Sequence, residues 1–313
     1  MYYLGIDLGG TNIAVGLVNE QGQILARNSI PTQASSGEDT VIARMAQAVK
    51  DLTAEAGVPL SEIVSVGVGS PGAIDSVSGT VLSACNLPFS HTPLAARLEA
   101  LLGRPVRVEN DANAAAWAEA VAGAARGTRD NIMITLGTGV GGGIVIGGRL
   151  YGGFNNYGGE FGHMIICADG EKCACGQSGC LEAYSSATAL IRDTRRAAEE
   201  KRDSLLWQCT EADGSFSGKT AFAAAACGDA AAKAVIDRYV HYLSLGLINL
   251  IRIFQPEVLV VGGGVAYAGE ALMAPLREKL DGYIGGKNNP RIEAAILGND
   301  AGIVGAALLG MEV

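Results

Sequence analysis

Residues 2–18 read YYLGIDLGGTNIAVGLV, and this stretch decides the fold class. An apolar run ends at Asp7, a Gly-Gly-Thr-Asn turn follows over 9–12, and a second apolar run comes next. A further turn leads into a third strand-like run at 23–26. Successive short strands joined by tight turns predict a β-meander at the start of the chain.

The opening pattern returns over residues 132–146, which read IMITLGTGVGGGIVI. Elsewhere, segments with apolar residues at helical spacing alternate with short apolar runs, which is typical of α/β proteins. The expected helices cover 40–56, 93–102, 111–125, 269–280, 301–309 and most of 181–254, and the expected strands cover 63–69, 106–109, 258–261 and 292–295. The sequence therefore predicts an α/β fold built on a duplicated unit of a β-meander plus helices.

The chain length favours two lobes, since 313 residues exceed the size of most single domains. We expect the boundary in the helix that follows Asp111, near Trp117. This prediction gives a small α/β lobe of residues 1–117 with the C-terminal helix 301–313, and a large α/β lobe of residues 118–300.

Charge and hydropathy argue against several classes of function. The formal net charge is -9 and no run of Lys and Arg forms a basic stripe, so we expect no nucleic-acid partner. No apolar run approaches the ~20 residues of a membrane span, and the first residues lack the pattern of a signal peptide. Seven cysteines in a chain of this size fit a reducing cytoplasm better than a disulfide framework.

Three glycine-rich turns each follow a predicted strand, at 9–12, 137–143 and 262–264. Glycine lets backbone N–H groups approach phosphate oxygens closely, and a threonine hydroxyl adds a neutral donor. Any one of these turns is equally well explained as a plain hairpin, but the three together favour phosphate binding.

Two familiar nucleotide motifs do not fit these turns. The spacing over 137–142 matches G-x-G-x-x-G, yet a hairpin follows where that motif opens a helix. The tripeptide 218–220 resembles the end of a Walker loop, but Asp213 stands where its first glycine is required.

Asp111 lies where a predicted strand meets a predicted helix, within Glu109-Asn110-Asp111-Ala112-Asn113. Polar residues at the carboxyl end of a strand line the ligand crevice of α/β proteins. Phosphoryl transfer to an alcohol needs a base that accepts the hydroxyl proton, and an Asp at this place can supply it. The alternative is that Asp111 or Asn110 only caps the helix, and the residues alone leave both interpretations open.

Four metal-ligating side chains fall within 18 residues: His163, Cys173, Cys175 and Cys180. One nitrogen and three sulfur ligands suit tetrahedral zinc, and a site with four protein ligands is structural. Cys167 is a rival ligand, but its apolar neighbours favour a place in the core. An accidental cluster of buried thiols is the alternative interpretation.

Two glutamates flank this cluster, Glu160 three residues before His163 and Glu182 two residues after Cys180. If zinc fixes the loop 163–180, both carboxylates gain fixed positions that suit hydrogen bonds to vicinal sugar hydroxyls. Otherwise they are solvated surface residues.

With these motifs, the chain resembles the ROK family of bacterial sugar kinases and repressors over nearly its whole length. The zinc motif together with the Gly-Glu-x-Gly-His segment makes the resemblance specific. The matching segments are 5–12 (GIDLGGTN), 69–73 (GSPGA), 110–113 (NDAN), 136–142 (LGTGVGG), 159–163 (GEFGH), 173–182 (CACGQSGCLE), 256–264 and 299–302 (NDAG).

The resemblance implies an actin-like, hexokinase-type (ribonuclease H-like) fold whose two lobes close on a cleft. It implies that Asp111 is the catalytic base toward the sugar 6-hydroxyl. The implied sugar-binding residues are Gly72, Asn86, Asn110, Asp111, Glu160, His163 and Glu182. The implied ATP-binding residues are Asp7, Gly10, Thr11, Asn12, Gly137, Thr138, Gly139, Gly263 and Gly264, with Asp7 holding Mg²⁺ directly or through water.

Within the family, the segment Asn86-Leu87-Pro88-Phe89 is similar to that of Gram-positive-type glucokinases. The implied activity is ATP-dependent phosphorylation of glucose to glucose 6-phosphate. The alternatives are a kinase for N-acetylmannosamine, N-acetylglucosamine, fructose, allose or mannose, and a sugar-responsive regulator without turnover. The resemblance also implies a homodimer, with a tetramer as the alternative.

Overall fold

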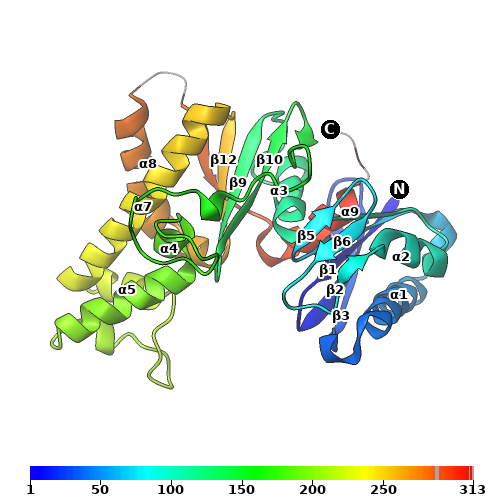
Figure 1. Cartoon of the computed structure of the whole chain (residues 1–313), viewed down its shortest axis with the longest axis horizontal. Helices are drawn as coiled ribbons and strands as arrows, with labels where there is room; N and C mark the ends of the chain where they lie inside the picture. Colours follow the sequence, from blue (N-terminus) through cyan, green and yellow to red (C-terminus); the bar gives the residue numbers. More distant parts are fainter. Residues whose placement is uncertain (286–288, 310, 312–313) are drawn as a thin grey trace. The chain divides into compact units, whose positions relative to one another are not determined.

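The computed structural model describes residues 1–285, 289–309 and 311, and Figure 1 shows its alternating strands and helices. These residues form two compact units. The first unit consists of Met1–Asn131, Gly143–Gly159 and Ile296–Val313, and the second of Ile132–Gly142 and Glu160–Ala295.

The first sheet has five strands in the order β3-β2-β1-β4-β8. Its strands are β1 (Tyr2–Leu8), β2 (Asn12–Asn19), β3 (Ile24–Pro31), β4 (Ile63–Ser70) and β8 (Val106–Asn110). The first three form the predicted antiparallel meander. Strands β1, β4 and β8 are parallel, and Asp7, Gly69 and Glu109 lie side by side across them. The carboxyl ends of these three strands therefore meet at one edge of the sheet.

Helices cover both faces of this sheet. Helices α1 (Glu38–Glu55) and α2 (Leu94–Leu102) share a core with Leu4 and Ile6 of β1, whereas α3 (Asp111–Val121) and α9 (Ala301–Leu308) share one with Tyr3. Helix α9 lies very close to the sheet, because a Cβ atom at Gly5 would stand 1.9 Å from the Ile303 carbonyl oxygen.

The second sheet repeats the strand order of the first, as β11-β10-β9-β12-β13. Its strands are β9 (Asn131–Leu136), β10 (Val140–Ile146), β11 (Arg149–Leu150), β12 (Val258–Gly262) and β13 (Arg291–Ala294). Strands β10 and β11 are antiparallel, like β2 and β3, and β12 and β13 are parallel, like β4 and β8. This common order agrees with the predicted duplication.

The remaining helices belong to the second unit: α4 (Glu182–Ser185), α5 (Ala187–Glu200), α6 (Thr220–Ala226), α7 (Ala230–Phe254) and α8 (Glu270–Ile284). The long helix α7 packs against α4, α5, α6 and α8. Among the helices of the described residues, none combines the length and apolarity needed to cross a bilayer.

The structure differs from the sequence prediction at three places. A small antiparallel sheet of β5 (Ala73–Asp75), β6 (Thr80–Ser83) and β7 (Ser90–Thr92) was not predicted, because its strands are too short to show periodicity. Helix α3 ends at Val121 instead of 125, since the buried Glu119 carboxylate accepts a hydrogen bond from Ala124 N (2.7 Å) and turns the chain.

The third difference is the division of the chain. The predicted lobes, 1–117 plus 301–313 and 118–300, do not follow the two compact units. Trp117 is buried, and its Nε1 donates a hydrogen bond to the Leu308 carbonyl oxygen (2.8 Å). The whole of α3 therefore packs within the first unit, and the chain passes to the second unit only at residue 132.

Candidate active site

Two carboxylates lie at the strand ends of the first sheet. Asp7 is the last residue but one of β1, and Asp111 is the first residue of α3, directly after β8. Burial, and then the charge of Asp111, raise the pKa of Asp7 to about 6. Burial also raises the pKa of Asp111. Both carboxylates therefore lie in a partly desolvated site, and the charge of Asp111 acts on Asp7.

The structure resolves the question of which residue caps α3. Asn110 Oδ1 accepts hydrogen bonds from the amides of Ala112 (2.9 Å) and Asn113 (3.3 Å), so Asn110 is the N-cap. Its Nδ2 donates to the Gly72 carbonyl oxygen (3.2 Å). Asp111 Oδ1 accepts a hydrogen bond from Ala112 N (2.9 Å), but the helix does not depend on Asp111 for its cap.

The first glycine turn lies beside the predicted sugar residue Asn86. Gly9 N donates to the Asn12 carbonyl oxygen (2.9 Å), which closes the turn, and Thr32 N donates to the Thr11 carbonyl oxygen (2.8 Å). A Cβ atom at Gly10 would stand 3.1 Å from Asn86 Cβ. The first unit thus brings Gly10 and Asn86 together, and Gly72 and Asn110 through their hydrogen bond.

The four predicted zinc ligands converge in the second unit. Their ligand atoms all lie within 4.8 Å of one another. His163 Nδ1 is 3.7 Å from Cys173 Sγ, and Cys175 Sγ is 3.7 Å from Cys180 Sγ. Zinc–sulfur bonds of about 2.3 Å in a tetrahedron place two sulfurs roughly 3.8 Å apart, so this quartet fits the ion. Cys167 lies outside the quartet and packs against the neighbouring apolar cluster.

The two nitrogens of His163 face different groups. Nδ1 faces the cysteine cluster, whereas Nε2 is 4.0 Å from Glu160 Oε2. Glu160 is mostly exposed, with 66% of its side chain accessible, so its carboxylate is open to solvent and to a ligand. One imidazole ring can therefore bind a metal through Nδ1 and present Nε2 to a substrate.

Glu182 connects the cysteine cluster to the second glycine turn. Its Oε1 lies 3.5 Å from Cys173 Sγ, and its Oε2 accepts a hydrogen bond from Val140 N (2.9 Å). The turn itself is held by the start of α5, since Ala187 N donates to the Gly137 carbonyl oxygen (2.8 Å) and Thr188 Oγ1 to that of Thr138 (2.7 Å).

The third glycine turn lies against the end of β9. Gly263 has φ +86°, and a Cβ atom there would stand 2.5 Å from Leu136 N, so only glycine allows this approach. Among the residues that the structure describes, none has an atom within 4 Å of the corresponding position at Gly264, which begins the short 3₁₀ helix Gly264–Ala268. The second and third glycine turns are therefore neighbours in the second unit.

Glu109 is a supporting residue that was not predicted from the sequence. Its side chain is buried at the end of β8, and Oε1 accepts hydrogen bonds from Asn110 N (2.9 Å) and Asn113 Nδ2 (3.0 Å). Burial raises the pKa of Glu109. The signal in the sequence was an acid inside the apolar strand 106–109, immediately before the Asn-Asp pair.

A magnesium ion fits the acids of the first unit. The charge of the Asp111 carboxylate acts on Asp7, so the two acids are neighbours. Mg²⁺ prefers carboxylate oxygens and keeps several waters, so a pair of neighbouring acids matches its chemistry.

Three features are typical of actin-like, hexokinase-type proteins: two sheets with the same strand order, acids at the strand ends, and paired glycine turns. The crystal structure of a ROK family glucokinase from Streptomyces griseus in complex with glucose and AMPPNP aligns with a TM-score of 0.81 and 38% identity, covering 99% of each chain. A glucokinase of Thermotoga maritima is 40% identical over 312 residues, which cover 99% of this chain and 97% of that protein.

A glucokinase of Streptomyces coelicolor is 39% identical over 315 residues, covering 99% of this chain and 97% of the relative. The sequence pattern of the ROK family matches residues 3–312. This chain therefore belongs to the ROK family, and its fold is the actin-like, hexokinase-type fold that the sequence predicted.

Proposed function

We propose that the protein is a glucokinase, which transfers the γ-phosphoryl group of ATP to the 6-hydroxyl of glucose. The supporting observation is full-length similarity to glucokinases at 38–40% identity, one of them bound to glucose and AMPPNP. The carboxylate of Asp111 at the β8–α3 junction gives this similarity a chemical basis, because the transfer requires a base at the attacking hydroxyl.

Asp111 is the proposed base. Asn110 caps the helix and bonds to Gly72, so the start of α3 is fixed without using the Asp111 carboxylate as its cap. Burial raises the pKa of Asp111, which makes its ionised form a stronger proton acceptor than an ordinary Asp. Asp111 takes the proton of the 6-hydroxyl as that oxygen attacks the γ-phosphorus. Such a base contributes a rate factor of about 100 to 10,000.

The other proposed site residues bind either the sugar or the nucleotide. The proposed sugar contacts are Gly72, Asn86, Asn110, Glu160, His163 and Glu182. The nucleotide is bound by Asp7, Gly10, Thr11, Asn12, Gly137, Thr138, Gly139, Gly263 and Gly264. Asp7 would hold Mg²⁺, directly or through water, and the ion when bound neutralises charge on the phosphates.

The proposed zinc ion has a structural role. His163, Cys173, Cys175 and Cys180 supply one nitrogen and three sulfurs, which leaves no open position for chemistry. Its ligands fix the loop 163–180, and with it the Nε2 face of His163 and the Glu182 carboxylate.

We also propose a cytoplasmic homodimer. Seven cysteines in a chain of 313 residues fit a reducing compartment better than a disulfide framework. Light scattering at several protein concentrations tests the dimer against the tetramer.

A coupled assay of ADP release over a panel of sugars tests the proposed function. We expect the highest kcat/KM with glucose and ATP, and lower values with mannose, fructose, allose and the N-acetylated amino sugars. Polyphosphate in place of ATP tests the donor. Turnover of another sugar in preference to glucose would overturn the substrate assignment, and binding of sugar without turnover would favour a regulator.

A further inference from the structure

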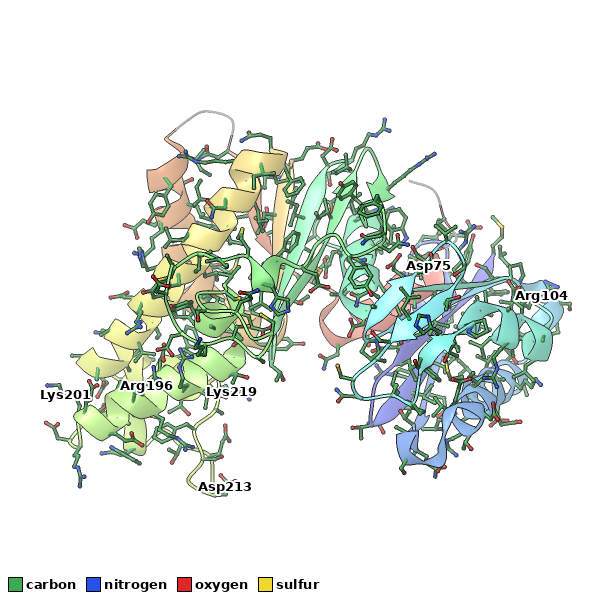
Figure 2. The ribbon with its side chains drawn as sticks, in the orientation of Figure 1. Asp75, Arg104, Arg196, Lys201, Asp213 and Lys219 are labelled. Atoms are coloured by element: carbon green, nitrogen blue, oxygen red, sulfur yellow. The ribbon has the colours of Figure 1, made fainter. Side chains whose placement is uncertain are left out.

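Glu171 lies in the loop 163–180, two residues before Cys173, and its carboxylate bonds to helix α5. Arg196 Nη1 donates a hydrogen bond to Glu171 Oε1 (2.7 Å), and Arg192 Nη1 lies 3.9 Å from Oε2. The Glu171 side chain is 28% exposed and that of Arg196 is 52% exposed, so the pair is partly hydrated. Figure 2 shows Arg196 on α5, in the unit that carries the loop.

Both backbone polar groups of Glu171, the amide and the carbonyl oxygen, form hydrogen bonds. Its amide donates to the Tyr184 hydroxyl (2.7 Å), and its carbonyl oxygen accepts from Gly179 N (2.8 Å). Tyr184 in turn packs on Tyr242 of α7, with ring centroids 4.2 Å apart. Residue 171 is therefore tied to α4, to α5 and to the far end of its own loop.

The two arginines are held in place by a second acid. Asp193 accepts a hydrogen bond from Arg192 Nε (2.8 Å), and its Oδ1 lies 3.6 Å from Arg196 Nη1. Both guanidinium groups thus lie on one side of α5 and face Glu171. A network of several charges with shared partners holds its geometry better than an isolated surface pair does.

We propose that Glu171 is a positioning residue, which holds the loop 163–180 against α5. This contact, called the clamp below, keeps Cys173 in place as a metal ligand and His163 in place as a ligand of both the metal and the sugar. The inference rests on the proposed function and on the proposed zinc ion. The clamp acts on the loop from outside the ligand quartet, since Glu171 is not one of the four ligands. Its loss should loosen zinc and weaken sugar binding while leaving the reacting groups unchanged.

The test uses the zinc-loaded protein and the variants Glu171→Gln, Arg196→Gln and the double variant. Zinc release to a chromophoric chelator is measured beside KM and kcat for glucose. We expect each single variant to release zinc about 10-fold faster, the scale seen for residues that support metal ligands, and to raise KM with kcat within about twofold. The double variant should be no worse than Glu171→Gln alone, because both changes remove the same contact.

Glu270→Gln is the matched control. Its carboxylate pairs with Arg277 (2.9 Å) on α8 of the same unit, remote in sequence from the loop 163–180, and this variant should keep wild-type zinc release and KM. If Glu171→Gln does not fold, Arg196→Gln still tests the clamp from the other partner.

Unchanged zinc release in an active Glu171→Gln enzyme would overturn the clamp, and so would effects that simply add in the double variant. Failure of the proposed function would look different, since the unmutated protein would then phosphorylate no sugar. The zinc-release measurement would still decide the clamp in that case.

Discussion

The two sheets share one strand order but differ in what stands at their strand ends. In the first sheet, Asp7 is the last residue but one of β1, and Asp111 directly follows β8. At the place in β9 that corresponds to Asp7 stands the uncharged Thr135, and the residue that directly follows β13 is Ala295. The second unit carries the cysteine cluster instead.

This difference separates two kinds of chemistry within one duplicated architecture. The acids of the first sheet have pKa values raised by desolvation, although Asp7 is only half-buried and Asp111 is exposed, and this suits a base and a magnesium ligand. The second glycine turn is uncharged, and it is held by backbone and hydroxyl donors from α5 and by the Glu182 carboxylate. A phosphate cradle of this kind needs no charge of its own. The two sheets therefore share one architecture, and the residues at their strand ends determine the chemistry that each can support.

The largest expected effect comes from removing the base. Asp111→Asn keeps the size of the side chain and leaves the Asn110 cap in place, but it cannot accept the hydroxyl proton. We expect kcat to fall by about 100- to 10,000-fold, with glucose binding measured by calorimetry retained. Asp213→Asn, in an exposed loop of the second unit, should keep wild-type kcat. Near-normal turnover by Asp111→Asn would remove the base assignment.

The pH dependence of the unmutated enzyme also tests the assignment of Asp111 as the base. Asp111 must be ionised to act, and its pKa is raised by burial. Activity should therefore fall with decreasing pH through a midpoint above 3.8, the ordinary value for this carboxyl. A profile of kcat/KM against pH measures this midpoint in the free enzyme.

The next effect concerns stability. The pKa of Asp7 is about 6 in the folded protein against 3.8 for a free carboxyl, so between these values the folded state binds more protons than the unfolded state. Stability must then decrease as pH rises from about 4 to about 6, and the loss is complete above that window. Asp7→Asn removes this loss. The gain at pH 7 to 8 should reach up to about 3 kcal/mol, since one pKa unit corresponds to about 1.4 kcal/mol.

Urea unfolding at pH 4 and pH 7.5, without Mg²⁺ or nucleotide, measures the gain. The difference between Asp7→Asn and wild type should be large at pH 7.5 and small at pH 4. Because Asp111 contributes to the shift, Asp7→Asn and Asp111→Asn together should stabilise by less than the sum of their separate effects. An equal effect of Asp7→Asn at both pH values would contradict the assignment.

Local patterns predicted much of this structure, because they depend on neighbouring residues. The strands around Asp7 and Glu109 appear within a residue or two of their expected limits, and the zinc quartet lies within one loop. Long-range pairings were not predictable. The Asn110 amide donates to the Gly72 carbonyl oxygen, 38 residues away, and Glu119 accepts hydrogen bonds from the Ile296 and Leu297 amides, 177 and 178 residues away.

The fourth prediction concerns the proposed metal site of the second unit. Cys175→Ser removes one thiolate from the quartet, so the loop 163–180 should lose zinc and with it the fixed positions of His163 and Glu182. We expect zinc content by mass spectrometry to drop and KM for glucose to rise by about 10-fold or more. Cys227→Ser, an exposed thiol outside the quartet, is the control and should change neither. Full zinc occupancy in Cys175→Ser would argue against the quartet as the metal site.

The smallest expected effect is a difference in KM between alanine substitutions in the first and second glycine turns. A Cβ atom at Gly139 would stand 2.3 Å from Glu182 Oε2, so Gly139→Ala must displace that carboxylate and break its bond to Val140. At Gly10, the equivalent atom meets Asn86 Cβ at 3.1 Å, which a shift of a few tenths of an ångström relieves. We expect KM for glucose to rise several-fold in Gly139→Ala and less in Gly10→Ala, with similar melting temperatures, because a flexible side chain gives way in the first case. Gly282→Ala, within α8 and with no atom of the described residues within 4 Å of its Cβ position, should keep wild-type KM. Equal KM values in Gly139→Ala and wild type would mean that the Glu182 carboxylate does not bind the sugar, and the role of the second unit would then rest on Glu160 and His163 alone.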